Sequence, residues 1–142
     1  MTAFWKNWLT LWSFGAGLFG LALYGAGYAA TTGPSNAIFK LLGNSLPDQP
    51  DQHLRFSLAL LGAVTAGWAL TFYAAFRAAW LLDDAASRPV WRLLSIAGLG
   101  WYAIDSCASI ATGFPLNAVS NTVLVATLLI PIWASGKQGA AV

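Results

Sequence analysis

The sequence predicts an all-α membrane protein, with four transmembrane helices in an antiparallel bundle and a short surface helix between the first and second helices. Three long stretches without a charged residue support this prediction: residues 7–39, 56–76 and 106–136. A helix needs about 20 mostly apolar residues to cross a hydrocarbon core roughly 30 Å thick. The last stretch extends back through Asp105 to Leu93, so it must fold back on itself. We therefore expect a single transmembrane domain over residues 1–142.

The composition is that of a chain embedded in lipid. Apolar residues make up 58% and charged residues only 8% of the chain, whereas about 25% charged residues is usual in soluble domains. The net charge of +2 is spread over loops and chain ends, which excludes the clustered basic face of a nucleic-acid-binding protein. The single cysteine, Cys107, excludes an internal disulfide. It lies inside an apolar run, where we expect a buried and inert thiol.

The first transmembrane helix is expected over residues 8–30. Its apolar stretch is much longer than the core of a signal peptide, so we interpret it as a retained helix. Pro34 then suits the first turn of a new helix, and Gly43 suits its end. The apolar residues between them predict a short helix on the membrane surface. An irregular linker with two prolines follows, over residues 45–52.

Three further transmembrane helices are expected over residues 53–82, 90–112 and 116–133. The helix over 53–82 is longer than a span needs, so it tilts or projects past the headgroups. A tight connection over residues 83–89 leads to the next helix, and Gly113 and Pro115 turn the chain before the last one. An even number of spans places both chain ends on the same side of the membrane.

The basic residues predict which side this is, because cytoplasmic loops are enriched in Lys and Arg. Five basic residues lie on the side of the chain ends: Lys6, Arg77, Arg88, Arg92 and Lys137. Two lie on the other side: Lys40 and Arg55. We therefore expect a multi-pass protein of the bacterial inner membrane with both termini in the cytoplasm.

Six of the eight tryptophans fall at the predicted cytoplasmic interface, where indole rings anchor membrane proteins: Trp5, Trp8, Trp12, Trp80, Trp91 and Trp133. The first three share one stripe of a helix, so contact with a partner or a pigment is the alternative interpretation. The segment from Phe4 to Trp8 resembles the start of bacterial antenna polypeptides, which ligate bacteriochlorophyll through an intramembrane histidine. The only histidine here, His53, lies at the outer interface, so we expect no pigment ligand in the first helix.

Two predicted helices carry faces of small residues, which let helix backbones approach closely in lipid. On the first helix this face comprises Ser13, Ala16, Gly17, Gly20 and Gly27, with Tyr24 among them. On the second helix it comprises Ala59, Ala63, Ala66, Gly67 and Ala74. We expect these faces to close the bundle on itself. The alternative is that one of them docks a neighbouring subunit or holds a flat cofactor.

Asp105 is the only charged residue that we expect to be buried in a span, since the arginines of the predicted spans lie near the span ends. It lies about 12 Å from the outer end of its helix at 1.5 Å per residue. An intramembrane carboxyl costs about 2.5–3.5 kcal/mol on insertion scales and is a candidate functional group. We interpret it as a structural clamp, protonated or hydrogen-bonded to Tyr102, Ser109 or Asn121. The alternative is a proton or cation site in a wet crevice. The full polar cluster comprises Tyr102, Asp105, Ser109, Asn117 and Asn121.

The sequence holds no motif typical of a catalytic, metal-binding or cofactor-binding site, and its lone Asp105, Cys107 and His53 make no nucleophile–base pair. In helix count and length it is similar to DoxX-like bacterial inner-membrane proteins, a resemblance that assigns no residue a role. We expect a non-enzymatic accessory or structural subunit of a larger membrane complex, which contributes helix packing and shields lipid or cofactor. Its expected partners are membrane lipid and other membrane subunits, with no cofactor of its own. The alternative is a small homo-oligomeric transporter or channel that uses Asp105 as its proton or cation site.

Overall fold

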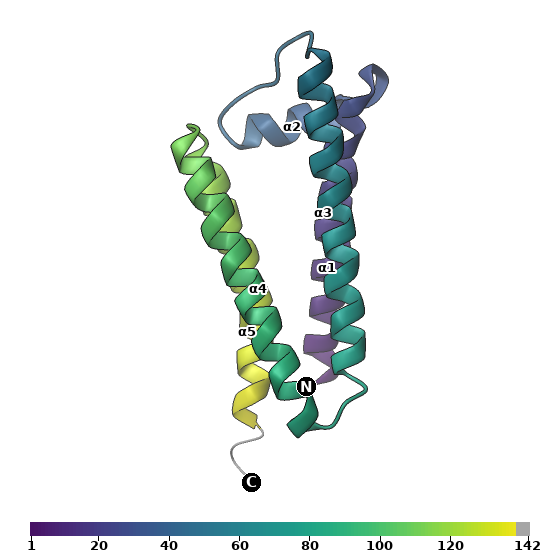
Figure 1. The fold of residues 1–142 in the computed structure, drawn as a ribbon, viewed down its shortest axis with the longest axis vertical. Helices are drawn as coiled ribbons and strands as arrows, with labels where there is room; N and C mark the ends of the chain where they lie inside the picture. The colour runs from purple at the N-terminus through teal and green to yellow at the C-terminus, as the bar shows by residue number, and fades with distance from the viewer. Residues whose placement is uncertain (139–142) are drawn as a thin grey trace. The chain divides into compact units, whose positions relative to one another are not determined.

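A computed structural model confirms the predicted fold class (Figure 1). It describes the backbone of residues 1–138 and the side chains of residues 1–135. This part of the chain contains five α-helices, two short 3₁₀ helices and no strand. Four of the α-helices are long and apolar enough to cross a membrane. The fifth is the short helix expected between the first and second spans.

The elements follow the predicted order with shifted ends. They are α1 (Ala3–Tyr24), η1 (Gly25–Gly27), η2 (Ala29–Thr31), α2 (Gly33–Leu41), α3 (Gln52–Ala79), α4 (Asp84–Ala111) and α5 (Pro115–Gln138). The first span ends earlier than predicted because the 3₁₀ turns η1 and η2 replace the expected last turns of α1. The last span continues past its predicted end at Trp133.

The start of α4 corrects the predicted connection over residues 83–89, because the helix already begins at Asp84. The carboxylate of Asp83 accepts a hydrogen bond from the backbone N–H of Ala86 at 2.8 Å, which satisfies one donor that the first helical turn leaves unpaired. Pro89 lies inside the helix and gives up one backbone hydrogen bond, since proline has no N–H. The Asp83 cap offsets this loss, so the connection contracts to residues 80–83.

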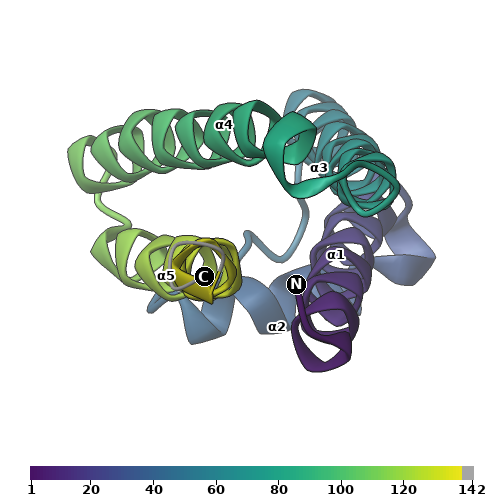
Figure 2. The same cartoon turned by 90° about the horizontal axis from the view of Figure 1, so that it is seen from below.

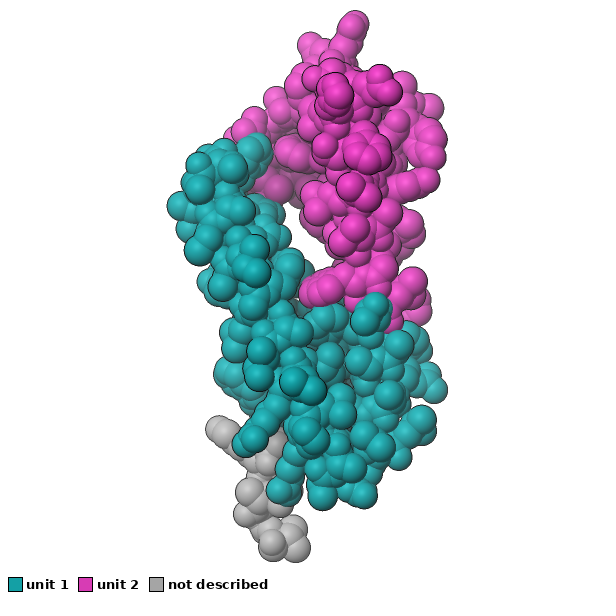
Figure 3. All heavy atoms as spheres, viewed as in Figure 1, with its two compact units in different colours: residues 1–13, 71–142 teal, residues 14–70 magenta. Residues whose placement is uncertain are grey.

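Two compact units make up the chain (Figure 3). Unit 1 comprises residues 1–13 and 71–142, and unit 2 comprises residues 14–70. Helices α1 and α3 each contribute to both units. Unit 1 therefore holds the start of α1, the end of α3 and the whole of α4 and α5, whereas α2 belongs to unit 2.

In unit 2, α1 and α3 run antiparallel and meet through their small residues. The facing pairs are Gly17 with Ala69, Gly20 with Ala66, Tyr24 with Gly62, and Gly27 with Ala59. A Cβ atom added at Gly20 would lie only 2.6 Å from the backbone N of Ala66 and 2.8 Å from the carbonyl O of Gly62. The two backbones are therefore in contact, as expected for small residues between membrane helices. The small face of α1 packs inside the chain at these positions.

The packing face of α3 differs from the predicted one. Ala59 and Ala66 face α1 as expected, but the closest approach is made by Gly62, which the sequence analysis did not select. The residues in contact with α1 recur at intervals of three and four, which is the seam of two helices packed at a shallow angle. The predicted set mixes this seam with a neighbouring stripe that is exposed in the structure: Ala63, Gly67 and Ala74.

Helices α4 and α5 form an antiparallel hairpin within unit 1 (Figure 1). The turn between them is tight (Figure 2). It contains Gly113, whose φ of 85° lies in the left-handed region, and only glycine adopts this region without a steric cost. Further along the hairpin, a Cβ atom added at Gly98 would lie 2.8 Å from Leu128 Cδ2. The absence of a side chain at Gly98 thus lets α5 lie close to α4.

A hydrogen bond from Trp8 joins α1 to α5 in unit 1. It also explains why α5 continues through a proline. Its indole N–H donates a hydrogen bond to the carbonyl of Thr127 at 2.9 Å. Within α5 this carbonyl would normally accept from the residue four positions on, but that residue is Pro131, which has no N–H. Trp8 thus supplies the donor that the proline withholds.

Trp12 departs from its expected role as an interfacial anchor, since it is only 7% exposed. Its ring packs against Phe72 and Phe76, with centroids 5.7 and 6.3 Å away. Its indole N–H donates to the carbonyl of Leu124 at 3.1 Å. Trp8 and Trp12 thus hold the start of α1 against α5 within unit 1. Trp133, by contrast, is 57% exposed.

Candidate functional site

The carboxyl group of Asp105 is bonded inside the α4–α5 hairpin. Its Oδ1 accepts hydrogen bonds from Ser109 Oγ at 3.0 Å and from Asn117 Nδ2 at 3.2 Å. Asn117 Nδ2 also donates to Ser109 Oγ at 2.8 Å. The three side chains therefore form a closed hydrogen-bonded ring, which we call the Asp105 ring, and Asn117 joins it from the opposite helix.

Helix geometry and the turn at Gly113 place these three side chains together. Ser109 follows Asp105 by one helical turn, so the two share a face of α4. Ser109 and Asn117 stand equally far from Gly113 along the chain, so the antiparallel hairpin brings them to the same depth. The Ser109 hydroxyl also lies 2.7 Å from the carbonyl O of Asp105. Its one hydrogen is therefore shared between the carbonyl and the carboxyl of the same residue.

The second carboxyl oxygen of Asp105 is in a different state. Among the described residues, none donates a hydrogen bond to Oδ2, and the side chain is only half-buried. The hairpin thus satisfies one oxygen of the carboxyl and leaves the other available to water or to another chain. This asymmetry is the one feature of the site that a purely internal clamp does not require.

Two members of the predicted cluster bond to residues other than Asp105. The buried Asn121 donates through Nδ2 to Ser106 Oγ at 3.4 Å, a long hydrogen bond. The hydroxyls of Tyr102 and Thr122 share a hydrogen bond of 3.1 Å. The cluster is therefore three separate contacts between α4 and α5. The cluster predicted from the sequence omitted Ser106 and Thr122. Each of them faces another polar residue across the hairpin, and this pairing is the pattern that could have predicted them.

Cys107 is exposed on α4, which corrects the expectation of a buried thiol. Its neighbours Ser106 and Ser109 are buried and occupy the side of α4 that meets α5. Cys107 therefore points away from that contact. Within residues 1–135, no group of three or more His, Cys, Asp or Glu side chains could hold a metal ion.

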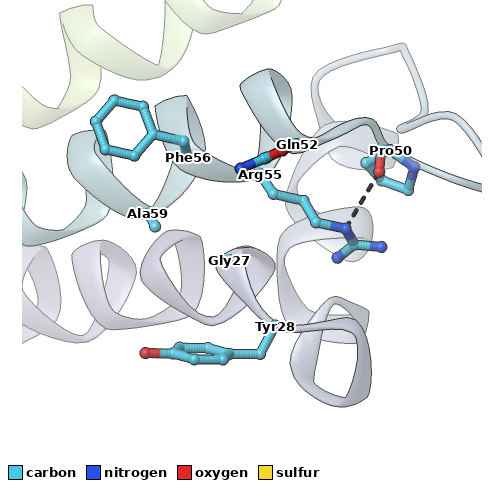
Figure 4. Close-up of a pocket in the computed structure, with 7 residues that line it drawn as sticks. All are labelled: Gly27, Tyr28, Pro50, Gln52, Arg55, Phe56 and Ala59. Atoms are coloured by element: carbon cyan, nitrogen blue, oxygen red, sulfur yellow. Dashed lines mark hydrogen bonds between the residues drawn. The ribbon is translucent and has the colours of Figure 1, made fainter.

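A shallow pocket of about 510 Å³ lies in unit 2 beside Arg55 (Figure 4). The guanidinium donates to the carbonyl of Pro50 at 3.1 Å, to the carbonyl of Ala26 at 3.2 Å and to Thr32 Oγ1 at 3.3 Å. Arg55 thus ties the start of α3 to the linker before it and to the end of the first span. A cation is favoured there because carbonyls at a helix C-terminus carry partial negative charge. Nε and Nη1 of Arg55 are used for this tie, which gives the pocket a structural character.

No protein-family model matches the chain, and no curated protein or solved structure shows significant similarity to it.

Proposed function

We propose that this protein is a non-enzymatic accessory subunit of a larger membrane complex, to which it contributes helix packing and lipid shielding. The observation that carries this proposal is an exposed face of small residues on α4, which we call the α4 face: Gly100, Ala103, Cys107 and Ala111. These residues recur every three or four positions and so lie along one side of the helix. A Cβ atom added at Gly100 would meet nothing within 4 Å. Another helix can therefore approach this face closely, and in lipid such approach drives association through packing.

The state of the polar groups supports the same proposal. The buried side chains Ser106, Ser109 and Asn121 are all hydrogen-bonded within the hairpin. An intramembrane path for ions instead needs polar groups or carbonyls that exchange partners with the ion. The Asp105 ring is therefore better suited to fixing the register of α4 against α5. Membrane lipid and neighbouring membrane subunits are the partners that this proposal requires.

A substitution on the α4 face tests the proposal. Ala103→Leu places a large side chain where the partner helix is expected, and overpacking of this kind typically costs about 1–3 kcal/mol. We expect the wild type to migrate in mild detergent with an assembly much larger than its own 15.0 kDa, and the Ala103→Leu variant to migrate alone. The matched control is Val119→Leu, which enlarges another exposed residue of the hairpin and should leave the assembly intact. Unchanged co-migration of the Ala103→Leu variant would show that the α4 face contacts lipid.

A small homo-oligomeric transporter or channel is the second candidate, favoured by the available Oδ2 of Asp105. Disulfide formation through the sole cysteine distinguishes this candidate from the first. Because Cys107 lies on the α4 face, oxidation of membranes should produce a disulfide-linked pair of identical chains if two copies meet there. An accessory subunit whose α4 face contacts a different protein should instead form no disulfide-linked pair of identical chains.

We also propose that the protein lies in a bacterial inner membrane with both chain ends in the cytoplasm. In unit 1, Lys6 near the start of α1 and Trp133 near the end of α5 line one depression, which supports ends on a common side. The side chain of Lys137, part of the basic count, lies outside the described residues.

Reporter fusions test this orientation. A fusion at Ser45, between α2 and α3, should report the periplasm, and a fusion at Leu82, between α3 and α4, should report the cytoplasm. Leu82 is preferable to a site a few residues later because α4 has already begun at Asp84. The opposite pattern of reporter activity would reverse the proposed orientation.

A further inference from the structure

A second depression, of about 1070 Å³, lies in unit 1 where α1 begins, α3 ends, α4 begins and α5 ends. Every residue that lines it belongs to unit 1. Three tryptophans contribute to its wall: Trp80, Trp91 and Trp133. Indole rings concentrate at the level of the lipid headgroups. The depression therefore lies where the polar part of a phospholipid is found.

The side chains that line this depression carry an excess of positive charge. Lys6, Arg88 and Arg92 line it, and Asp84 is the only acid that does so. Arg88 and Arg92 are one helical turn apart on α4, a spacing at which like charges repel each other. Among the described residues, neither arginine forms an ion pair or a hydrogen bond. The Lys6 ammonium lies over the Trp80 ring, 5.9 Å from its centroid. An anion in the depression would relieve this repulsion.

Two buried polar groups in the same wall lack partners. The indole N–H of Trp80 and the hydroxyl of Ser135 are inaccessible to solvent, and no described residue hydrogen-bonds with either group. Both residues line the depression. Buried donors are almost always paired in native proteins. These two donors therefore need an acceptor from outside the chain. Phosphate oxygens are strong acceptors that fit the unpaired guanidinium groups, and a shift of the Trp80 or Ser135 side chain would bring its donor to the same acceptor.

Apolar surface borders the charged groups. Ile96 lines the depression one helical turn beyond Arg92, toward the middle of the span, and is 64% exposed. A soluble phosphate ester would leave this side chain uncovered, whereas an acyl chain of a lipid would cover it. Basic pockets between transmembrane helices are a known means of binding anionic headgroups.

We infer that this depression binds the phosphate group of an anionic phospholipid from the surrounding leaflet, with Arg88 and Arg92 as its main cationic contacts. This inference uses unit 1 alone and does not depend on the proposed docking of the α4 face. Loss of the lipid site and loss of assembly are therefore separate experimental results.

Native mass spectrometry of the purified protein tests the inference. The probes are phosphatidylglycerol and phosphatidylcholine with identical acyl chains, because they differ in net charge. We expect phosphatidylglycerol to be retained preferentially. The double variant Arg88→Gln/Arg92→Gln should bind it about 25- to 30-fold more weakly, since each basic residue near an anionic lipid contributes about a factor of five. The control Lys40→Gln/Arg77→Gln removes two charges from exposed residues outside the depression and should leave retention unchanged.

Trp80→Phe provides an independent test, because it removes the indole N–H and keeps an aromatic ring. No described residue accepts a hydrogen bond from this N–H, so without added lipid the variant should unfold at the same temperature as the wild type or slightly above it. With phosphatidylglycerol present, the stabilisation by lipid should be smaller in the variant. An equal lipid effect in both proteins would exclude Trp80 from the site.

Three results would overturn the inference. Equal retention of the two lipids would show that the depression does not select an anion. An equal loss in the Lys40→Gln/Arg77→Gln control would mean that net charge alone attracts the lipid. Displacement of phosphatidylglycerol by glycerol 3-phosphate at a comparable concentration would instead assign the depression to a soluble phosphate ester.

Discussion

Replacing Gly20 with leucine is expected to separate α1 from α3 in unit 2. The added side chain would begin with a Cβ atom 2.6 Å from the backbone N of Ala66, a position that cannot relax by a rotamer change because the obstacle is backbone. Overpacking typically costs about 1–3 kcal/mol, occasionally more. We expect a clear drop in the thermal unfolding temperature in detergent, measured by circular dichroism.

Gly62→Ala extends this test from the other helix. Even a single methyl group there would lie 2.5 Å from the carbonyl O of Gly20 and closer still to the backbone N of Tyr24. The smallest possible side chain should therefore destabilise the protein to an extent similar to Gly20→Leu. The matched control is Gly15→Leu on α1, because a Cβ atom at Gly15 meets nothing within 4 Å. If Gly15→Leu and Gly20→Leu lowered the unfolding temperature equally, close packing at Gly20 would not be the cause.

Replacing Asp105 with leucine is expected to destabilise the hairpin, whereas Asp105→Asn should be tolerated. Leucine removes the oxygen to which Ser109 and Asn117 both donate. Ser109 keeps its hydrogen bond to the carbonyl of residue 105 and Asn117 keeps the one to Ser109, so the expected cost is that of the lost hydrogen bonds, about 1 kcal/mol each. Asparagine keeps a carbonyl oxygen at a similar position and can accept both hydrogen bonds. Thermal unfolding of the two variants beside the wild type measures the difference. Equal stability of all three proteins would mean that the Asp105 ring does not clamp the hairpin.

The same Asp105→Asn variant decides between the two candidate functions. In liposomes, an accessory subunit should dissipate neither a proton gradient nor a cation gradient, with or without the carboxyl. If the wild type dissipates a gradient and Asp105→Asn does not, the available Oδ2 is part of a transport site. That result would replace the accessory role by the homo-oligomeric transporter.

Several structural features follow from local properties of the sequence. The four spans are predictable because bilayer thickness sets their length and apolar side chains their composition. The contact between Ser109 and Asn117 is predictable because both residues are equally far from Gly113 along the chain. A tight turn at Gly113 brings two such residues to the same depth of the hairpin. The carboxyl of Asp105 falls within their reach through helix periodicity alone. All three residues belong to the polar cluster predicted from the sequence, but from the last helix that prediction named Asn121 as the partner of Asp105, whereas the structure gives Asn117.

Other features were decided by contacts that no local pattern encodes. In lipid, a helix can be apolar on all sides, so the sequence does not distinguish the stripe of α3 that packs from the one that is exposed. Gly62 was therefore missed, and Ala63 was placed on the wrong side. The continuation of α5 through Pro131 depends on a donor from Trp8, more than a hundred residues away in the chain. The sequence by itself thus determined how many helices cross the membrane and where the chain turns. The tertiary structure decided which faces meet, because close packing depends on the shapes of both helices at once.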